Sequence, residues 1–231
     1  MQGSAFAKSV GGDPQRASTY AAAAKAVTHG LRSHVGTDGF VSEAENRRVD
    51  SAIIEAFNVG DMNDGVFAPL SREAAQTLKT LSHYFCNAFA INQQGASANV
   101  SGVLFGRYQG DSYAGGNPWI LLTASAATLL YRQSLALATG AKLGPTAAGA
   151  LQSLLGQEVT PDNLLAGGDE ILHRMKSFLR NGMHMNEQLD RNSGRPLSAK
   201  DLTWNYANVL RAMLARGAAV AAKGSLRSIT V

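Results

Sequence analysis

The chain has 231 residues, of which 45% are hydrophobic and 16% are charged. Such a chain is long enough to bury a sizeable core and too apolar for a disordered segment. The formal net charge of +4 is mild, and the densest basic spot, Arg47-Arg48, lies between acidic residues, which argues against a nucleic-acid partner. No continuous apolar run has spanning length, and the N-terminus lacks a signal-peptide pattern, so neither a membrane partner nor a leader is expected.

Cysteine and histidine usage predicts neither a disulfide nor a metal site. Cys86 is the single cysteine, which excludes a disulfide within the chain. It lies in an apolar helical stretch, where a buried, inert thiol is expected rather than a reactive one. The histidines show no ligand spacing, and each is expected to be a surface or hydrogen-bonded residue.

Helical patterns follow one another from the N-terminus onward. Asp13-Pro14 places a capping side chain before a proline, the favoured start of a helix, and Asn117-Pro118 repeats this pattern. Ser71 precedes a helix whose apolar residues recur three or four positions apart. The predicted helices cover residues 2–10, 13–34, 71–89, 117–140, 146–155, 163–180 and 199–216, with a further short apolar segment at 49–57.

Almost no strand signal accompanies these helices, apart from an extended stretch at residues 40–42. The pattern therefore predicts an all-α fold that forms one domain, residues 1–231. The connections are longer than helix bundles usually need, notably residues 92–116. Long loops in a compact domain tend to be functional.

Residues 183–204 form the first candidate site. Their first half has no helical or strand period and carries Asn, Gly and Asp, as loops do. Ser198 and Asp201 then resemble a capping box, which predicts a helix from Ala199 onward. Glu187 is thereby expected in a polar loop that a helix holds from behind. From composition alone, an acidic loop residue is more often solvated than catalytic.

Residues 106–119 form the second candidate site. Here an arginine, amide and carboxylate side chains and aromatic rings alternate with glycines just before a predicted helix. Planar donors and acceptors hold sugar hydroxyls, and aromatic faces pack against the C–H faces of a pyranose. The alternative is a surface turn in which Arg107 pairs locally with Asp111. The candidate substrate-binding residues are Arg107, Tyr108, Asp111, Tyr113 and Trp119.

Both segments resemble glucoamylases, the glycoside hydrolases of family fifteen. Those enzymes carry a Ser-Glu-Gln-Tyr/Phe-Asp loop, a Gly and then Leu-Ser-Ala-x-Asp-Leu-Thr-Trp-Ser-Tyr-Ala. This chain has Asn-Glu-Gln-Leu-Asp at 186–190, Gly194 and Leu-Ser-Ala-Lys-Asp-Leu-Thr-Trp-Asn-Tyr-Ala at 197–207. Residues 106–119 are similar to Gly-Arg-Tyr-Pro-Glu-Asp-x-Tyr-x-x-Gly-Asn-Pro-Trp, except at Gln109 and Gly110. A third similarity is Gly-Ser-Ala-Phe-Ala at residues 3–7.

The resemblance implies a barrel of six paired helices, the (α/α)6 toroid. It also implies a glucan 1,4-alpha-glucosidase that releases glucose with inversion from the non-reducing ends of starch, glycogen and maltooligosaccharides. Glu187 would be the general base, while Arg107 and Trp119 would contact the substrate. Asp111 and Tyr113 would shape the pocket, and no metal or organic cofactor is implied. Most members of the family are secreted, and trehalases or glucodextranase-type hydrolases are the alternative within this architecture.

The resemblance also leaves part of the chemistry unaccounted for. The family's general acid lies in a Trp-x-Glu-Glu segment upstream of Gly-Ser-Ala-Phe-Ala, for which there is no room before Gly3. The chain thus resembles about the C-terminal half of the catalytic domain, without a starch-binding module, and the N-terminal half is an expected partner. Inverting glycosidases need an acid and a base about 6.5–9.5 Å apart, so little or no activity is expected of the isolated chain.

Two further points follow from the missing acid segment. Several carboxylates of this chain are conceivable substitutes, although they lie in no recognisable acid motif: Glu43, Glu45, Glu55 and Asp111. The alternative function is a non-catalytic carbohydrate-binding fragment that has kept the sugar-facing loops.

Overall fold

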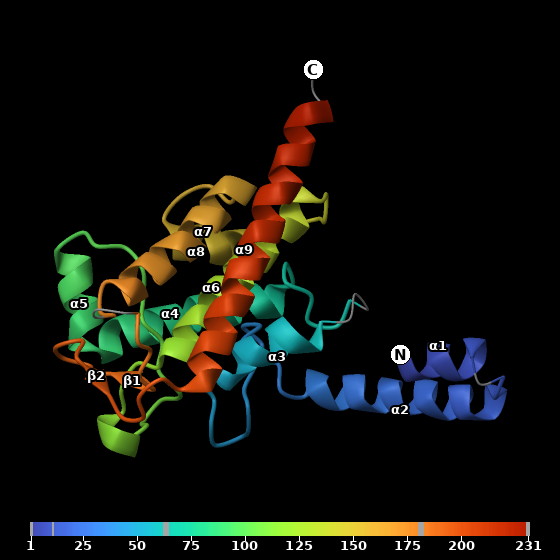
Figure 1. Cartoon of the computed structure of the whole chain (residues 1–231). Helices are drawn as coiled ribbons and strands as arrows, with labels where there is room; N and C mark the ends of the chain where they lie inside the picture. The colour runs from blue at the N-terminus through green and yellow to red at the C-terminus, as the bar shows by residue number, and fades with distance from the viewer. Residues whose placement is uncertain (1, 11, 62–64, 180–182, 230–231) are drawn as a thin grey trace.

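The computed structural model describes residues 2–10, 12–61, 65–179 and 183–229, and these are mostly helical (Figure 1). The helices are α1 (Gln2–Ser9), α2 (Pro14–Arg32), α3 (Ala52–Gly60), α4 (Arg72–Ala88), α5 (Ala90–Ser97), α6 (Ile120–Ala138), α7 (Pro145–Leu155), α8 (Pro161–Lys176) and α9 (Thr203–Ile229), with the 3-10 helix η1 at Tyr113–Gly115. Two short strands, β1 (Gln188–Leu189) and β2 (Pro196–Leu197), pair antiparallel. The all-α prediction is confirmed.

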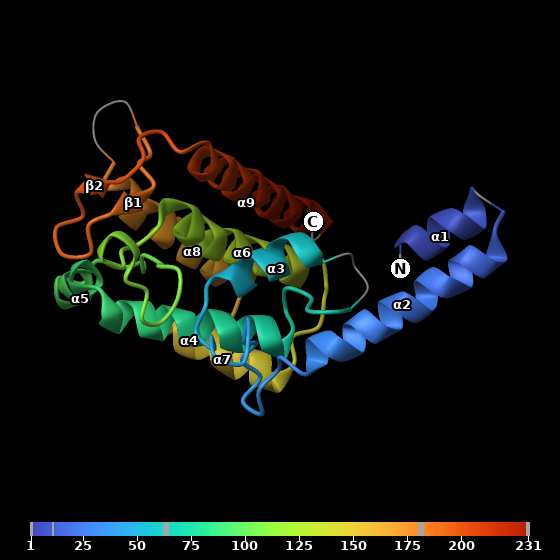
Figure 2. The same ribbon diagram turned by 90° about the horizontal axis from the view of Figure 1, so that it is seen from below.

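The central helix of the molecule is α6. Every residue from Ile120 to Tyr131 is buried, and α6 packs against α3, α8 and α9. The length and hydropathy of α6 would also suit a membrane span. However, 78% of its apolar 18-residue window is buried inside the protein, as in the core helix of a folded domain. Figure 2 shows α6 between α9 and α4. Cys86 of α4 is a free thiol and is half-buried, less covered than predicted.

At the N-terminus, α1 and α2 form a hairpin, the arm, that projects from the rest of the molecule (Figure 1). The two helices pack on each other. As predicted, α2 starts at a cap, because the Asp13 carboxylate accepts a hydrogen bond of 2.9 Å from the backbone nitrogen of Arg16. Large apolar side chains of the arm are exposed, namely Phe6, Val10, Tyr20, Val27 and Leu31.

The predicted loop at 92–116 and the predicted start of the following helix were partly wrong. α5 extends into the loop, and α6 begins at Ile120 rather than at the Asn117-Pro118 pair. Asn117 is buried, and its amide donates to the Ala114 carbonyl at 2.6 Å and to Gln188 Oε1 at 3.0 Å. A contact with a distant loop therefore overrides the local capping pattern. The predicted helix end at Arg180 lies outside the described residues.

The capping box predicted for the last helix was also wrong. Ser198 and Asp201 have φ angles of 63° and 52°, in the left-handed region. The chain therefore turns at both positions, and α9 begins at Thr203 rather than at Ala199. At its other end α9 continues beyond Gly217, because an isolated glycine weakens a helix without ending it.

Asp201 does not cap the helix, as its sequence context suggested, but contacts two side chains. Its carboxylate accepts a hydrogen bond of 2.5 Å from the Tyr206 hydroxyl and lies 2.9 Å from His184 Nδ1. Those two hydrogen bonds, that of Tyr206 first, hold the pKa of Asp201 below its ordinary value. The Tyr206 hydroxyl also accepts from the backbone nitrogen of Met185 at 3.1 Å. Asp201 thus fastens the start of the candidate loop to the first turns of α9.

Candidate functional site

The loop that carries Glu187 is a structured β-hairpin. β1 and β2 pair through Gln188 with Leu197 and Leu189 with Pro196. At the tip, Asp190 Oδ1 accepts hydrogen bonds from the backbone nitrogen and hydroxyl of Ser193, both at 2.8 Å. These bonds lower the pKa of Asp190, so it is ionised and the turn is held closed near neutral pH.

Glu187 stands immediately before β1. Its backbone nitrogen donates to the Ala199 carbonyl at 2.8 Å, which fixes the base of the hairpin. The side chain is half-buried, and its nearest hydrogen-bonding group is the Gln188 amide at 3.4 Å. Among the described residues no cation pairs with this carboxylate. An unpaired, half-exposed carboxylate can accept a proton from a water molecule, as a general base must.

Asn205, in the first turn of α9, holds this loop against the core. The side chain is fully buried. Its oxygen accepts from the backbone nitrogen of Leu121 at 3.1 Å, and its nitrogen donates to the carbonyl of Asn186 at 2.7 Å. The glucoamylase pattern has Ser at this position. The change from Ser to Asn was therefore the one feature of the sequence that could have pointed to this residue. The longer amide side chain can bond to α6 and to the loop together.

The second candidate segment gathers the predicted sugar-contacting side chains around Arg107. The guanidinium donates to both carboxylate oxygens of Asp111, at 2.8 and 2.5 Å. Its carbon lies 4.8 Å from the centre of the Tyr113 ring and 5.3 Å from that of Trp119, and 5.2 Å from that of Tyr108. The local Arg–Asp pair was one of the two readings of the sequence. Only 5% of the Asp111 side chain is accessible, although the neighbouring residues 109–110 and 112–115 are exposed.

The two segments are bound to each other next to Glu187. Besides the amide bond from Asn117 to Gln188, the backbone nitrogen of Leu189 donates to the Pro118 carbonyl at 3.0 Å. Trp119 and Gln188 form an isolated antiparallel bridge. The residue after Glu187 is therefore fixed against Trp119. The structure thus joins the backbone that follows the predicted base to Trp119, one member of the predicted binding cluster.

A third segment, residues 47–50, packs against the second candidate segment, and only its basic pair, Arg47-Arg48, had stood out in the sequence. The Arg47 guanidinium lies 4.4 Å from the centre of the Tyr108 ring. The backbone nitrogen of Gln109 donates to the Val49 carbonyl at 2.9 Å. Asp50 is buried, and its burial raises its pKa. A cavity of about 200 Å³ borders the cluster, lined in part by Arg107, Tyr108, Asp111, Asn117 and Arg191.

The substitutes considered for a general acid do not fit that role. Burial alone would raise the pKa of Asp111, but the hydrogen bonds from Arg107 and from the backbone of Tyr113 outweigh it, and the net pKa is lowered. Glu55 accepts hydrogen bonds from Ser125, Asn208 and Arg211. Glu43 and Glu45 are exposed. The described residues also contain no group of three or more metal-ligating side chains.

The sequence profile of the protein family described as glycosyl hydrolases family 15 matches residues 1–214 of this chain. The chain belongs to glycosyl hydrolase family 15. Two similar proteins are glucoamylase-1 of Schizophyllum commune, 32% identical over 99% of this chain, and glucoamylase 1 of Rhizopus oryzae, 27% identical over 96%. These alignments cover only 43% and 41% of the two relatives. The resemblance found in the sequence is confirmed.

Solved glucoamylases of this family share the fold. The enzyme from Hypocrea jecorina superposes with a TM-score of 0.78 at 28% identity, over 94% of this chain and 40% of that one. The enzyme from Saccharomycopsis fibuligera gives 0.78 at 23% identity, over 94% and 53%. The family 15 chain is thus part of an (α/α)6 barrel, as predicted.

The Arg107–Asp111 pair leads to a prediction about stability and pH. Because the pKa of Asp111 is lowered on folding, the pair stabilises the protein above the ordinary pKa of 3.8 and is lost as the pH falls below it. Asp111→Asn should lower the free energy of unfolding by about 2 kcal/mol at pH 7. The difference from the wild type should shrink in urea titrations below pH 3.8.

The matched control for that prediction is Asp38→Asn, which breaks the exposed pair between Asp38 and Arg48. Exposed pairs contribute little, so this variant should lose less than about 1 kcal/mol. Equal losses for the two variants, or a loss for Asp111→Asn that does not depend on pH, would contradict a stabilising role for the pair.

Proposed function

We propose that this chain supplies the general base and one side of the sugar pocket of an inverting α-1,4-glucan glucosidase. Glu187 removes a proton from the attacking water, and Arg107, Tyr108, Asp111, Tyr113 and Trp119 bind the terminal sugars. The general acid comes from the part of the barrel that the relatives have outside the matched region. In this proposal the isolated chain binds maltooligosaccharides and turns them over slowly or not at all.

The main support for the proposal is the set of contacts between the two candidate segments, residues 106–119 and 183–204. Gln188, next to Glu187, is hydrogen-bonded to Asn117, and Trp119 pairs with the same strand. The backbone next to Glu187 is thereby joined to Trp119, and no cation among the described residues pairs with the Glu187 carboxylate. Aromatic faces and planar donors suit a pyranose, and a free carboxylate suits the activation of water.

The need for a second polypeptide segment follows from the chemistry. An inverting glycosidase requires one carboxyl group to protonate the leaving oxygen and another to activate water, about 6.5–9.5 Å apart. Glu187 can perform one of these steps only. Of the substitutes considered, Asp111 is held ionised by Arg107, and Glu55 is occupied by three donors.

The proposal is tested by glucose release from maltoheptaose. The purified chain should release little glucose, and adding the segment of the S. commune catalytic domain that lies outside the matched region should raise the rate by about 100-fold or more, the contribution of a general acid. Glucose of the β anomer, seen by proton NMR, would establish inversion. Release of the α anomer, or full activity of the chain alone, would contradict the proposal.

The second candidate is carbohydrate binding without turnover. It is favoured by one observation, that none of the substitute carboxylates considered is suited to act as the acid. Micromolar or millimolar affinity for maltose, measured by calorimetry, together with no glucose release in the presence of the added segment would support this second function.

A further inference from the structure

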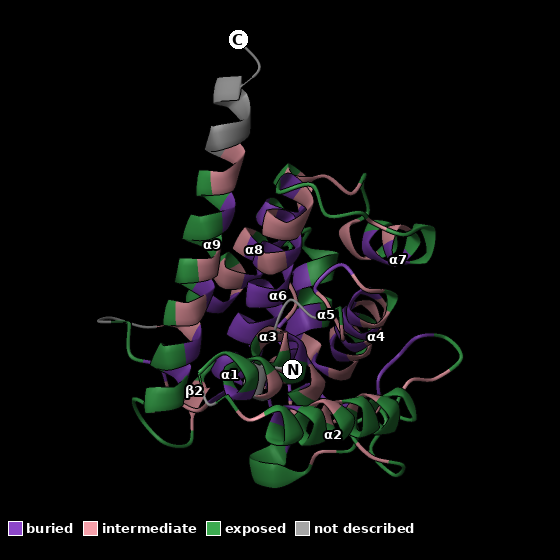
Figure 3. Cartoon of the chain, turned by 90° about the vertical axis from the view of Figure 1, so that its right-hand side faces the viewer, coloured by how far each residue is buried: buried purple, intermediate pink, exposed green. Residues whose placement is uncertain are grey.

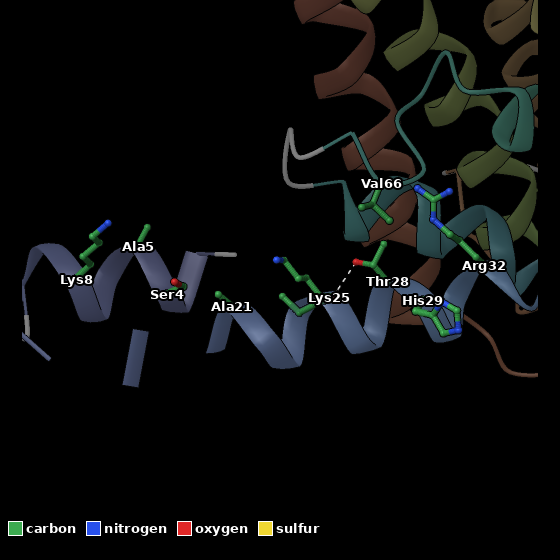
Figure 4. A pocket seen from close by; sticks show the side chains of 10 residues that line it. Ser4, Ala5, Lys8, Ala21, Lys25, Thr28, His29, Arg32 and Val66 are labelled. Carbon is green, nitrogen blue, oxygen red and sulfur yellow. Dashed lines mark hydrogen bonds between the residues drawn. The ribbon is translucent and has the colours of Figure 1, made fainter. Parts of the chain in front are cut away.

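Two hollows in the described part of the molecule differ in character. A groove of about 660 Å³ runs along the arm, where the lining residues include Ala5, Lys8, Ala21 and Lys25 (Figure 4). The surrounding helices are mostly exposed, and of the described residues of α2 only Ala17 is buried (Figure 3). Nothing in the structure indicates what occupies this groove. The second hollow lies in the folded body, and several polar side chains line it.

This second hollow is a cavity of about 200 Å³ where the end of α4, the second candidate segment and the β1–β2 hairpin meet. The polar residues that line this Arg191 cavity are Tyr84, Arg107, Tyr108, Asp111, Asn117 and Arg191. Pockets that enclose a drug-sized ligand measure roughly 300–1,000 Å³. The Arg191 cavity is smaller, and it therefore suits one small polar group rather than a whole oligosaccharide.

Arg191 brings a positive charge that no carboxylate neutralises among the described residues. Its guanidinium donates to the backbone carbonyl oxygens of Ala88 and Gly115, and its carbon lies 5.3 Å from the centre of the Phe89 ring. These acceptors are neutral, and the ion pairs within the described ranges do not include Arg191. A guanidinium has five N–H donors, so some of them remain for a ligand.

The other charges on the lining balance each other. Arg107 donates to both carboxylate oxygens of Asp111, at 2.8 and 2.5 Å, so this pair adds no net charge. Tyr84 and Tyr108 also line the cavity, and their hydroxyls form no hydrogen bond with any described residue. The lining thus has two guanidinium groups against one carboxylate, and this excess of positive charge favours an anion.

Gly110 keeps a further carboxylate away from this lining. The glucoamylase pattern has Glu at this position, where the chain has a glycine that lines the cavity. Gly110 has a φ of +80°, and nothing lies within 4 Å of the position of its Cβ atom, so a side chain has room there. A glutamate at position 110 would bring a second negative charge to the lining and cancel the excess.

We propose that the Arg191 cavity binds a phosphate monoester carried by a sugar. The planar guanidinium of Arg191 suits phosphate oxygens, which it can bind through two parallel N–H donors. The Tyr84 and Tyr108 hydroxyls supply further donors. Arg107 belongs both to this lining and to the aromatic cluster, since its carbon lies 4.8 Å from the centre of the Tyr113 ring. A sugar held by the cluster therefore places its phosphate in the cavity.

The sugar half of this ligand rests on the proposed function, which the inference deepens by naming a phosphorylated glucan as the substrate class. The phosphate half rests on the cavity alone. Binding of either half can be measured without any turnover.

The test is calorimetric titration of the full chain with glucose 6-phosphate, glucose, glucuronate and inorganic phosphate. Glucose 6-phosphate should bind about tenfold more tightly than glucose, and more weakly as salt is added. It should also bind more tightly than glucuronate or inorganic phosphate. Equal affinities for glucose and glucose 6-phosphate would overturn the proposal. Tighter binding of glucuronate or of inorganic phosphate would overturn it too, because the site would then not select a sugar phosphate.

Gly110 offers a matched pair of variants. Gly110→Glu and Gly110→Gln impose the same left-handed strain and add side chains of nearly the same shape, so they differ in charge alone. Gly110→Glu should bind glucose 6-phosphate about tenfold more weakly than Gly110→Gln, because its carboxylate repels the phosphate. Equal affinities of these two variants would contradict a role for the excess positive charge and overturn the proposal.

Arg191→Gln should weaken the binding of glucose 6-phosphate by about 30-fold. Its control is Arg195→Gln, an exposed change on the same hairpin that should bind like the wild type. Arg191 also holds the Ala88 carbonyl, so circular dichroism must establish that the variant is folded. An unchanged affinity of folded Arg191→Gln would overturn the proposal, and the two Gly110 variants decide the matter if Arg191→Gln does not fold.

These measurements separate the cavity from the proposed function. Selective binding of glucose 6-phosphate without any glucose release in the presence of the added S. commune segment would support the cavity and refute the glucosidase. Turnover of maltoheptaose together with equal affinities for glucose and glucose 6-phosphate would support the glucosidase and overturn the assignment of the cavity.

Discussion

Glu187→Gln should abolish glucose release by the chain assembled with its complementary segment, with a decrease in kcat of about 100- to 10,000-fold. Glutamine has nearly the same shape as glutamate, and its amide cannot take a proton from water. The backbone bond from Glu187 to Ala199 does not involve the side chain, so the hairpin should persist. The measurement is the initial rate of glucose release from maltoheptaose, with affinity for maltose measured in parallel.

Glu158→Gln is the control for this substitution, because Glu158 is exposed in the turn between α7 and α8, at a distance along the chain from both candidate segments. It should keep the wild-type rate. If Glu187→Gln retained more than about a tenth of the activity, another residue would have to be the base. A loss of maltose affinity with an unchanged kcat would instead identify Glu187 as a binding residue.

Gly116→Ala should cause the largest loss of stability among changes in the second candidate segment, residues 106–119. Gly116 has a φ of +65°, and a Cβ atom there would lie 1.9 Å from the Asp111 carbonyl oxygen, which is backbone and cannot rotate away. Left-handed strain and the forced shift of the turn together should cost about 3 kcal/mol or more. The movement would also disturb the Arg107–Asp111 pair, so affinity for maltose should fall with the melting temperature.

Gly156→Ala separates these two causes. Gly156 has a φ of +67°, close to that of Gly116, and nothing lies within 4 Å of the position of its Cβ atom. It should therefore show only the left-handed strain, about 1–2 kcal/mol. Equal decreases in the free energy of unfolding, measured with urea, would mean that the close approach to Asp111 has no energetic consequence.

The local chemistry of the chain determined most helices and the composition of the site. Helical periodicity and the caps at Asp13 and Ser71 placed α2 and α4 within a few residues of their observed bounds. The alternation of Arg107 with carboxylate and aromatic residues predicted a cluster that the structure does contain. These features could be predicted because they depend on residues close together in sequence.

Contacts between segments distant in sequence determined the features that local patterns did not predict. Asn117 and Asp201 stand where caps were expected, but each is engaged by a group that folding brings near, Gln188 in one case and His184 in the other. Asn205 became a link between α6 and the Glu187 loop because both happen to reach its buried amide. No periodicity or local pattern encodes such pairings, since their energies arise only when the helices are packed. The sequence by itself therefore determined which side chains the two candidate segments contain, and the tertiary structure alone determined how those side chains are held together.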